Sequence, residues 1–191
     1  AKNAAPKPGD RPHQRPCFMI WTTTPWTLPA NVAVAVHAKI EYALVWVDGN
    51  VTVIAANLVE KVTKMAGAES VVVLATALGE KLVGLRYRHP FVTDVPKCAL
   101  QRACAIEGVW SIVTADYVTI EDGTGMVHTA PGHGTEDYQT GLKHNLPVYC
   151  PVRGDGTFAG ADFSVALRRQ QLLDAIERSA ATGMRQSVQG L

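Results

Sequence analysis

The hydrophobic positions of this 191-residue chain fall mostly into short runs separated by turn-forming residues. Asp48-Gly49-Asn50 is typical of a hairpin turn between two such runs, and 122–125 of another tight turn. Runs rich in Val, Ala and aromatic residues predict short strands at 17–22, 32–36, 42–47, 51–55, 70–76, 85–88, 108–115, 117–120, 126–129 and 147–152. Many short strands joined by long irregular connections indicate a mainly β fold.

Helical patterns are fewer, and they are predicted at 57–66, 135–144 and 164–182. In the first helix Asn57 can cap the N-terminus, and Gly67 ends the helix. Its apolar face is predicted to consist of Leu58, Val62 and Met65. Strands and helices do not alternate along the chain, so a doubly wound sheet is not expected. We predict a β-barrel decorated with peripheral helices.

Composition limits the class of protein without identifying it. Apolar residues make up 47% and charged residues 18%, as in a globular domain. The formal net charge of +1 is small for a free-standing nucleic-acid binder, so any such contact is expected to be limited. The four cysteines form no C-x-x-C pair, which indicates scattered reduced thiols, and no apolar run is long enough to span a membrane. We expect a basic, proline-rich linker or edge of an excised segment at 1–16, and one domain at 17–191.

The first stretch whose residue types suggest a role in binding or catalysis is Trp21-Thr-Thr-Thr-Pro-Trp-Thr27. Threonine hydroxyls at the end of a strand can bind a carbonyl, a phosphate or a ribose, and can position a water. Trp21 and Trp26 would add a flat apolar wall that suits a nucleoside. The alternative is a threonine-rich turn whose hydroxyls only cap backbone groups.

The second stretch runs from Gly123 to Tyr138 and carries a histidine, a glycine-rich loop and a carboxylate at a predicted helix start. His128, His133 and Asp137 could ligate a metal, although their spacing is not that of a helix-borne zinc site. His128 could instead be a general base or a satisfied structural residue. In a further reading, the segment lines a pocket in which Asp137 pairs with a cationic group of the substrate.

Together, TTTPWTLPAN and GTGMVHTAPGHGTEDY, about one hundred residues later, resemble the paired signature of the isoleucyl-tRNA synthetase editing domain. The resemblance covers about residues 17–160. It implies a closed β-barrel core of the valyl-, isoleucyl- and leucyl-type editing domains, inserted in the catalytic domain of a class I synthetase. Thr24 stands where valyl- and leucyl-type relatives usually carry Arg, and His128 where the valyl type has Lys. Both positions favour the isoleucyl branch.

By this resemblance, the domain would hydrolyse misacylated Val-tRNA(Ile) and valyl adenylate while excluding isoleucine. Asp137 would hold the α-ammonium of the aminoacyl group, and His128 would form part of the wall that blocks isoleucine. The resemblance assigns catalysis to Thr22, Thr23, Thr24 and Asp137. It assigns substrate binding to Trp21, Trp26, Thr27, His128, Thr129, Gly132 and His133. No residue stands out as a covalent nucleophile, so direct attack by water is expected.

The resemblance also implies the partners and the setting. They are the valine-bearing 3′ end of tRNA(Ile), valyl adenylate and the rest of the synthetase chain in cis, with no membrane. No cofactor or metal is expected for editing, whereas ATP, and usually Mg or Zn, would serve the parent enzyme, which attaches isoleucine to tRNA. A cytoplasmic location is expected, with an organelle as the alternative. Three other readings remain: a metal-dependent hydrolase, a module that only binds nucleotide or tRNA ends, and a stand-alone editing protein.

Overall fold

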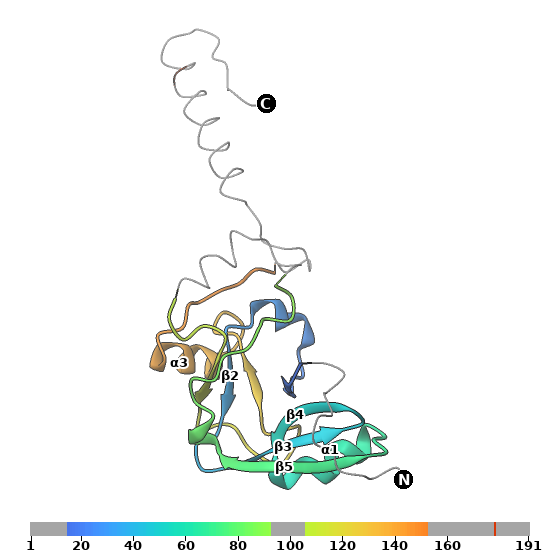
Figure 1. The fold of residues 1–191 in the computed structure, drawn as a ribbon. Helices are drawn as coiled ribbons and strands as arrows, with labels where there is room; N and C mark the ends of the chain where they lie inside the picture. Colours follow the sequence, from blue (N-terminus) through green and yellow to red (C-terminus); the bar gives the residue numbers. More distant parts are fainter. Residues whose placement is uncertain (1–14, 93–105, 153–177, 179–191) are drawn as a thin grey trace.

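The computed structural model describes residues 15–92, 106–152 and 178 of the chain. The predicted helix at 164–182 and most of the predicted linker therefore lie outside the described residues. The described elements follow one another, as Figure 1 shows, in this order: β1 (Cys17–Phe18), the 3-10 helix η1 (Pro25–Ala30), β2 (Ala33–Val36), β3 (Glu41–Val47), β4 (Asn50–Ala55), η2 (Ala56–Leu58), α1 (Val59–Met65), β5 (Val71–Leu78), η3 (Gly79–Lys81), β6 (Ser111–Thr114), β7 (Val127–Thr129) and α3 (Thr135–Lys143).

Four strands form the larger sheet, in the order β1-β4-β3-β5. The central strand β3 is antiparallel to both β4 and β5, while β1 runs parallel to β4. Asp48 and Gly49 have φ values of 46° and 86°, the left-handed conformation of a two-residue hairpin turn. The predicted hairpin is thus confirmed, and α1 packs near β3 in the lower part of Figure 1.

The smaller sheet has the order β6-β2-β7, with β2 parallel to β6 and antiparallel to β7. All four residues of β2 are buried, so both faces of this central strand lie in apolar surroundings. Small Ala side chains alternate there with Val, and they pack into two apolar clusters on opposite sides of the strand. η1 directly precedes β2 along the chain, β7 pairs with β2, and α3 contacts β7 (Figure 1).

The segment from Cys17 to Trp21 connects the two sheets. Its first residues pair with β4, and the Met19 amide donates to the Val53 carbonyl at 3.3 Å. The Trp21 amide then donates to the Met126 carbonyl at 2.8 Å, and Trp21 forms a parallel bridge with Val127 of β7. The predicted strand at 17–22 is therefore shortened to β1, because the chain leaves one sheet and joins the other.

A second connection lies on the far edge of the smaller sheet. The Tyr87 amide donates to the Trp110 carbonyl at 2.9 Å, and Arg86 forms an isolated bridge with Ser111 of β6. Regular strand pairing does not extend beyond this bridge, so the strand predicted at 85–88 is wrong. Within 15–92 and 106–152 the strands form two linked sheets, and no closed barrel is found.

The mainly β class with peripheral helices is confirmed, but several elements differ from the prediction. The segments 117–120 and 147–152 are not strands; in the second, Pro147 and Pro151 cannot donate hydrogen bonds to a ladder. Asn57 does not cap α1, because it lies in η2 and Leu58 holds the N-cap position without a side-chain bond. Met65 is 75% exposed and does not belong to the buried face. No helix of the described segments is long and apolar enough to cross a membrane.

Candidate functional site

The threonine motif begins where the chain leaves its pairing with β7. The Thr24 amide donates to the Thr22 hydroxyl at 3.1 Å, which closes a tight turn. Pro25 then occupies the first position of η1, where its fixed φ and missing donor are tolerated. Pro29 also lies inside η1 and cannot donate a backbone hydrogen bond. With its two prolines, this stretch forms a 3-10 helix instead of a regular α-helix or a strand.

Hydroxyl groups join this turn to the second motif. Thr24 Oγ1 lies 3.4 Å from Thr22 Oγ1 and 3.5 Å from Thr27 Oγ1. The Thr27 hydroxyl donates to the Thr24 carbonyl at 2.7 Å, and its oxygen lies 3.0 Å from His128 Nε2. The two motifs, one hundred and one residues apart at this contact, therefore meet in one place.

His128 lies on β7 opposite Val34 and is almost fully buried. A hydroxyl has one proton to donate, and that of Thr27 is directed at the Thr24 carbonyl. His128 Nε2 must then donate to Thr27, which leaves Nδ1 as an acceptor; this nitrogen is buried without a hydrogen-bond partner. Burial lowers the pKa of His128 below its ordinary value of 6.5, although the negative charge of Asp137 raises it in part. The imidazole is therefore neutral.

Asp137 occupies the first turn of α3, as predicted. Its Oδ2 accepts a 2.8 Å hydrogen bond from the Ala130 amide at the end of β7. Its Oδ1 accepts a 3.1 Å hydrogen bond from the Tyr117 hydroxyl. The loop between β7 and α3 is closed by a turn from the His133 amide to the Ala130 carbonyl, so the carboxylate anchors both ends of that loop.

The predicted catalytic and substrate-binding residues differ in their exposure to solvent. Trp26 and Trp21 are 66% and 46% exposed, and Thr23 and His133 are also open to solvent. The buried members are Thr27, His128 and Thr129. Gly132 is half-buried against Cys150, and an added Cβ would stand 2.1 Å from that thiol sulfur.

The Gly123-Thr-Gly125 turn positions Trp21. Gly123 has a φ of +76°, and a Cβ there would lie 2.4 Å from the Trp21 ring. Gly125 has a φ of +72°, and a Cβ there would lie 2.4 Å from the Cβ of Ala55. Only glycine allows both the turn and these close approaches. The turn therefore holds Trp21 beside β7 at the entrance to the threonine motif.

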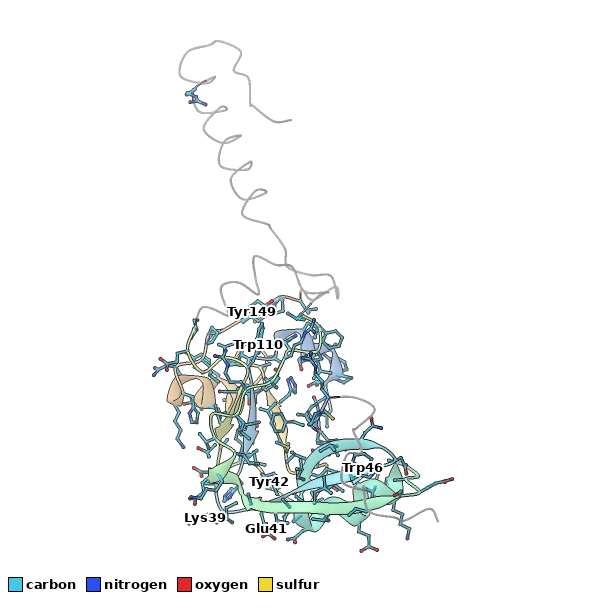
Figure 2. The ribbon with its side chains drawn as sticks, viewed as in Figure 1. Lys39, Glu41, Tyr42, Trp46, Trp110 and Tyr149 are labelled. Carbon is cyan, nitrogen blue, oxygen red and sulfur yellow. The ribbon has the colours of Figure 1, made fainter. Side chains whose placement is uncertain are left out.

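Sequence reasoning missed the residues that support η1. The Asn31 side chain donates to the Ala33 carbonyl at 2.8 Å and accepts a hydrogen bond from the Tyr87 hydroxyl. The Trp110 indole donates to the Asn31 carbonyl at 3.2 Å; Figure 2 labels Trp110 near the upper end of β2. His89 is buried against Trp110, with ring centroids 5.4 Å apart. These contacts join segments far apart in sequence, which no local pattern indicates.

Tyr117 was also missed as a site residue, because it lies 20 positions before its partner Asp137 in a segment predicted to be a strand. Its ring borders a pocket of about 270 Å³ between the end of β6 and α3. The other residues around this pocket are Thr114, Ala115, Asp116, Thr135, Glu136, Gln139, Thr140 and Lys143. None of the threonines of the first motif lines it, and Tyr117 is the residue that this pocket shares with the candidate site.

The metal alternative needs His128, His133 and Asp137 to converge. Across 15–92 and 106–152, no three His, Cys, Asp or Glu side chains lie close enough to hold one metal ion. The geometry instead places the neutral His128 imidazole against the Thr27 hydroxyl, and it anchors the Asp137 carboxylate to Ala130 and Tyr117. Such a site can bind a cation and orient a polar ester without a metal ligand set.

Comparison with known structures defines the class of fold. The chain matches the cytosolic leucyl-tRNA synthetase editing domain of P. knowlesi with a TM-score of 0.50 and 16% identity, over 69% of this chain and 55% of that one. The P. falciparum counterpart also gives a TM-score of 0.50, with 17% identity over 73% of this chain and 52% of that one. The fold is that of an aminoacyl-tRNA synthetase editing domain.

Sequence similarity narrows the class further. The isoleucine–tRNA ligase of Carboxydothermus hydrogenoformans is 50% identical over 144 residues, or 74% of this chain, and that of Methanothermobacter marburgensis is 46% identical over 141 residues. The chain thus matches the editing-domain region of isoleucyl-tRNA synthetases. It spans only 14% and 12% of the lengths of these two relatives. No protein-family model matches the chain.

Proposed function

We propose that this chain is a hydrolytic editing module that removes valine from Val-tRNA(Ile) and from valyl adenylate while excluding isoleucine. The observation that supports this proposal best is the meeting of the two motifs through Thr27 and His128, with Asp137 anchored nearby. The parent enzyme in this proposal attaches isoleucine to tRNA with ATP and contributes its remaining chain in cis. Its setting would be cytoplasmic.

The ammonium group of the aminoacyl ester would bind Asp137. An ionised carboxylate has about four acceptor positions, and Ala130 and Tyr117 occupy one on each oxygen. Acceptor capacity therefore remains for a substrate N–H donor. A charge-assisted bond of this kind both holds the substrate and fixes its orientation.

Ester cleavage would follow by direct attack of water on the carbonyl carbon. The hydroxyls of Thr22, Thr23 and Thr24 would position this water and stabilise the developing oxyanion. The acyl carbon–oxygen bond then breaks, and the leaving ribose oxygen takes up a proton, which yields free valine and tRNA. A neighbouring ribose hydroxyl of the substrate would assist this proton transfer. Trp21 and Trp26 have the exposed faces that would border the terminal adenosine.

Exclusion of isoleucine would depend on a rigid wall at His128. Valine lacks one methylene of isoleucine, and a difference of this size gives only about 1–3 kcal/mol in an apolar pocket, a magnitude for which isoleucyl enzymes are themselves the standard example. A second site that is too small for the larger side chain adds the missing discrimination. His128 is buried and bonded to Thr27, which suits a fixed wall.

We include a closed β-barrel in this proposal. Segment 17–21 bonds to both β4 and β7, which connects one edge of each sheet. Segment 84–87 bonds to β6 on the other edge and follows β5 by only a few residues. Two connections of this kind are what a distorted barrel requires.

Deacylation by the full chain tests the proposed function. The chain is incubated separately with Val-tRNA(Ile) and Ile-tRNA(Ile), and release of each amino acid is followed over time. We expect hydrolysis of the valyl ester with the isoleucyl ester largely intact, and no loss of activity with a chelator. Binding of a non-hydrolysable valyl-adenosine analogue gives a second readout. The absence of both hydrolysis and binding would reject the proposal.

A further inference from the structure

The Tyr117 hydroxyl lies 3.1 Å from Asp137 Oδ1, while the Ala130 amide donates to the other carboxylate oxygen, Oδ2. We infer that Tyr117 is a positioning residue for editing, because its hydroxyl fixes the Asp137 carboxylate in the orientation that receives the substrate α-ammonium. This inference rests on the proposed function, since it assumes that Asp137 binds that ammonium.

Two donors from different elements determine the orientation of the carboxylate. The Ala130 amide belongs to the end of β7, and Tyr117 follows β6, whereas Asp137 itself lies on α3. A single bond to Oδ2 would leave the carboxylate free to rotate about its last side-chain torsion, which is broad in aspartate. The second bond, to Oδ1, removes that freedom. The remaining acceptor positions then point in a fixed direction, which is the usual requirement for a preorganised site.

Tyr117 is suited to be a permanent donor. Burial raises the pKa of its phenol well above the ordinary value of 10.0, and the negative charge of Asp137 raises it further. The hydroxyl therefore keeps its proton at neutral pH. It cannot take the proton of an attacking water, so its contribution is geometric.

The ring and the hydroxyl of Tyr117 have separable roles. The ring packs against the apolar cluster that contains Val113, Ala115 and Val118, and this contact does not need the oxygen. Tyr117→Phe keeps the ring and removes only the donor. Tyr138 offers a matched control, because it is adjacent to Asp137 on α3 and its side chain is exposed. Tyr138→Phe removes the same atom without removing the bond to the carboxylate.

The test compares two esters on the parent chain, Tyr117→Phe and Tyr138→Phe. One ester is Val-tRNA(Ile), and the other is its 3-methylbutanoyl analogue, in which hydrogen replaces the α-amino group. For Tyr117→Phe we expect kcat/KM for the valyl ester to fall roughly tenfold, the size of a hydrogen bond to a charged group. Its kcat/KM for the analogue should stay at the parent value. Tyr138→Phe should match the parent with both esters.

Because both esters are assayed on the same sample, a fraction of unfolded protein would lower both values together and leave their ratio unchanged. An equal loss with both esters would assign Tyr117 a merely structural role and overturn the inference. An unchanged Tyr117→Phe variant of an active parent would also overturn it, without affecting the proposed function. A parent chain that neither hydrolyses the valyl ester nor binds the valyl-adenosine analogue would reject the proposed function, and the inference with it.

Discussion

The four-stranded sheet and the candidate site are stabilised in different ways. In the sheet, β3 pairs along its length with β4 and β5, and repeated backbone bonds and buried apolar side chains hold it. At the site, short or irregular segments meet through single side chains such as Asp137, Thr27 and Asn31. The sheet can thus lose one contact and keep its shape, whereas each contact at the site determines the position of a whole segment.

Asp137→Ala would show this difference most strongly. It removes the proposed ammonium partner and the acceptor for Ala130 and Tyr117 together. We expect kcat/KM for Val-tRNA(Ile) to fall about 1000-fold, corresponding to about 4 kcal/mol in transition-state binding. Glu136→Ala is the control, since this exposed neighbour also lies in the first turn of α3. Deacylation at the parent rate in Asp137→Ala would show that the carboxylate has no part in editing.

Ile54→Ala tests the other half of the comparison, the apolar packing of the four-stranded sheet. Ile54 on β4 is fully buried in the apolar cluster beneath the larger sheet. Removing its side chain should lower the free energy of unfolding by about 2–5 kcal/mol, with the editing rate per folded molecule unchanged. Val73→Ala on the exposed part of β5 should cost less than about 0.5 kcal/mol. Denaturant unfolding measures both, and equal losses would contradict the assigned core.

Thr27→Val tests whether the Thr27 hydroxyl holds His128 in place as the wall that is proposed to exclude isoleucine. Valine has nearly the shape of threonine but cannot accept the bond from His128 Nε2. A lost bond of about 1 kcal/mol should free the imidazole, and isoleucyl-ester hydrolysis should rise about fivefold relative to valyl-ester hydrolysis. Thr27→Ser keeps the hydroxyl and should keep the parent ratio. The ratio of kcat/KM for the two esters is the measurement; an unchanged ratio in Thr27→Val would mean that the wall does not depend on this bond.

The last expected effect is a dependence of stability on pH. Burial lowers the pKa values of His128 and His89 below their ordinary value of 6.5. The unfolded chain then binds protons more readily, so stability is full above about pH 6.5 and falls as the pH drops from there toward the folded pKa values. The slope should be at most about 1.4 kcal/mol per pH unit for each histidine. Unfolding free energies from pH 7.5 to 5 measure it. His89→Gln and His128→Gln should each reduce the slope, whereas a flat or rising profile toward low pH would contradict neutral buried histidines.

Sequence patterns predicted the regular half of the molecule well. The strands around Asp48-Gly49 and the helix beginning at Thr135 lie close to their predicted bounds, because hydrophobic periodicity and turn residues act locally. The strand predicted at 147–152 is wrong because Pro147 and Pro151 have no backbone donor, which outweighs the apolar residues between them. The helix end at Gly67 is confirmed by its φ of +67°.

The two motifs of the site could be predicted from the sequence, but the residues that hold these motifs in place could not. In the structure, the negative charge of Asp137 raises the pKa of His128 in part, which partly offsets the effect of burial. Tyr117, Asn31 and Tyr87 were not predicted, since they act through hydrogen bonds to residues of other segments. A contact of that kind leaves no periodic signal in a single sequence. The roles of the site residues in editing stay predictions.

The pairing of Trp21 with Val127 of β7 also limits the order in which the chain can fold. Trp21 is synthesised 106 residues before its partner Val127. Contacts of such long sequence separation are costly to close and raise the contact order, which slows folding. The hairpin of β3 and β4 can form as soon as it is synthesised, whereas the threonine motif has no fixed place until β7 exists. During synthesis, editing competence would therefore be the last property of this domain to arise.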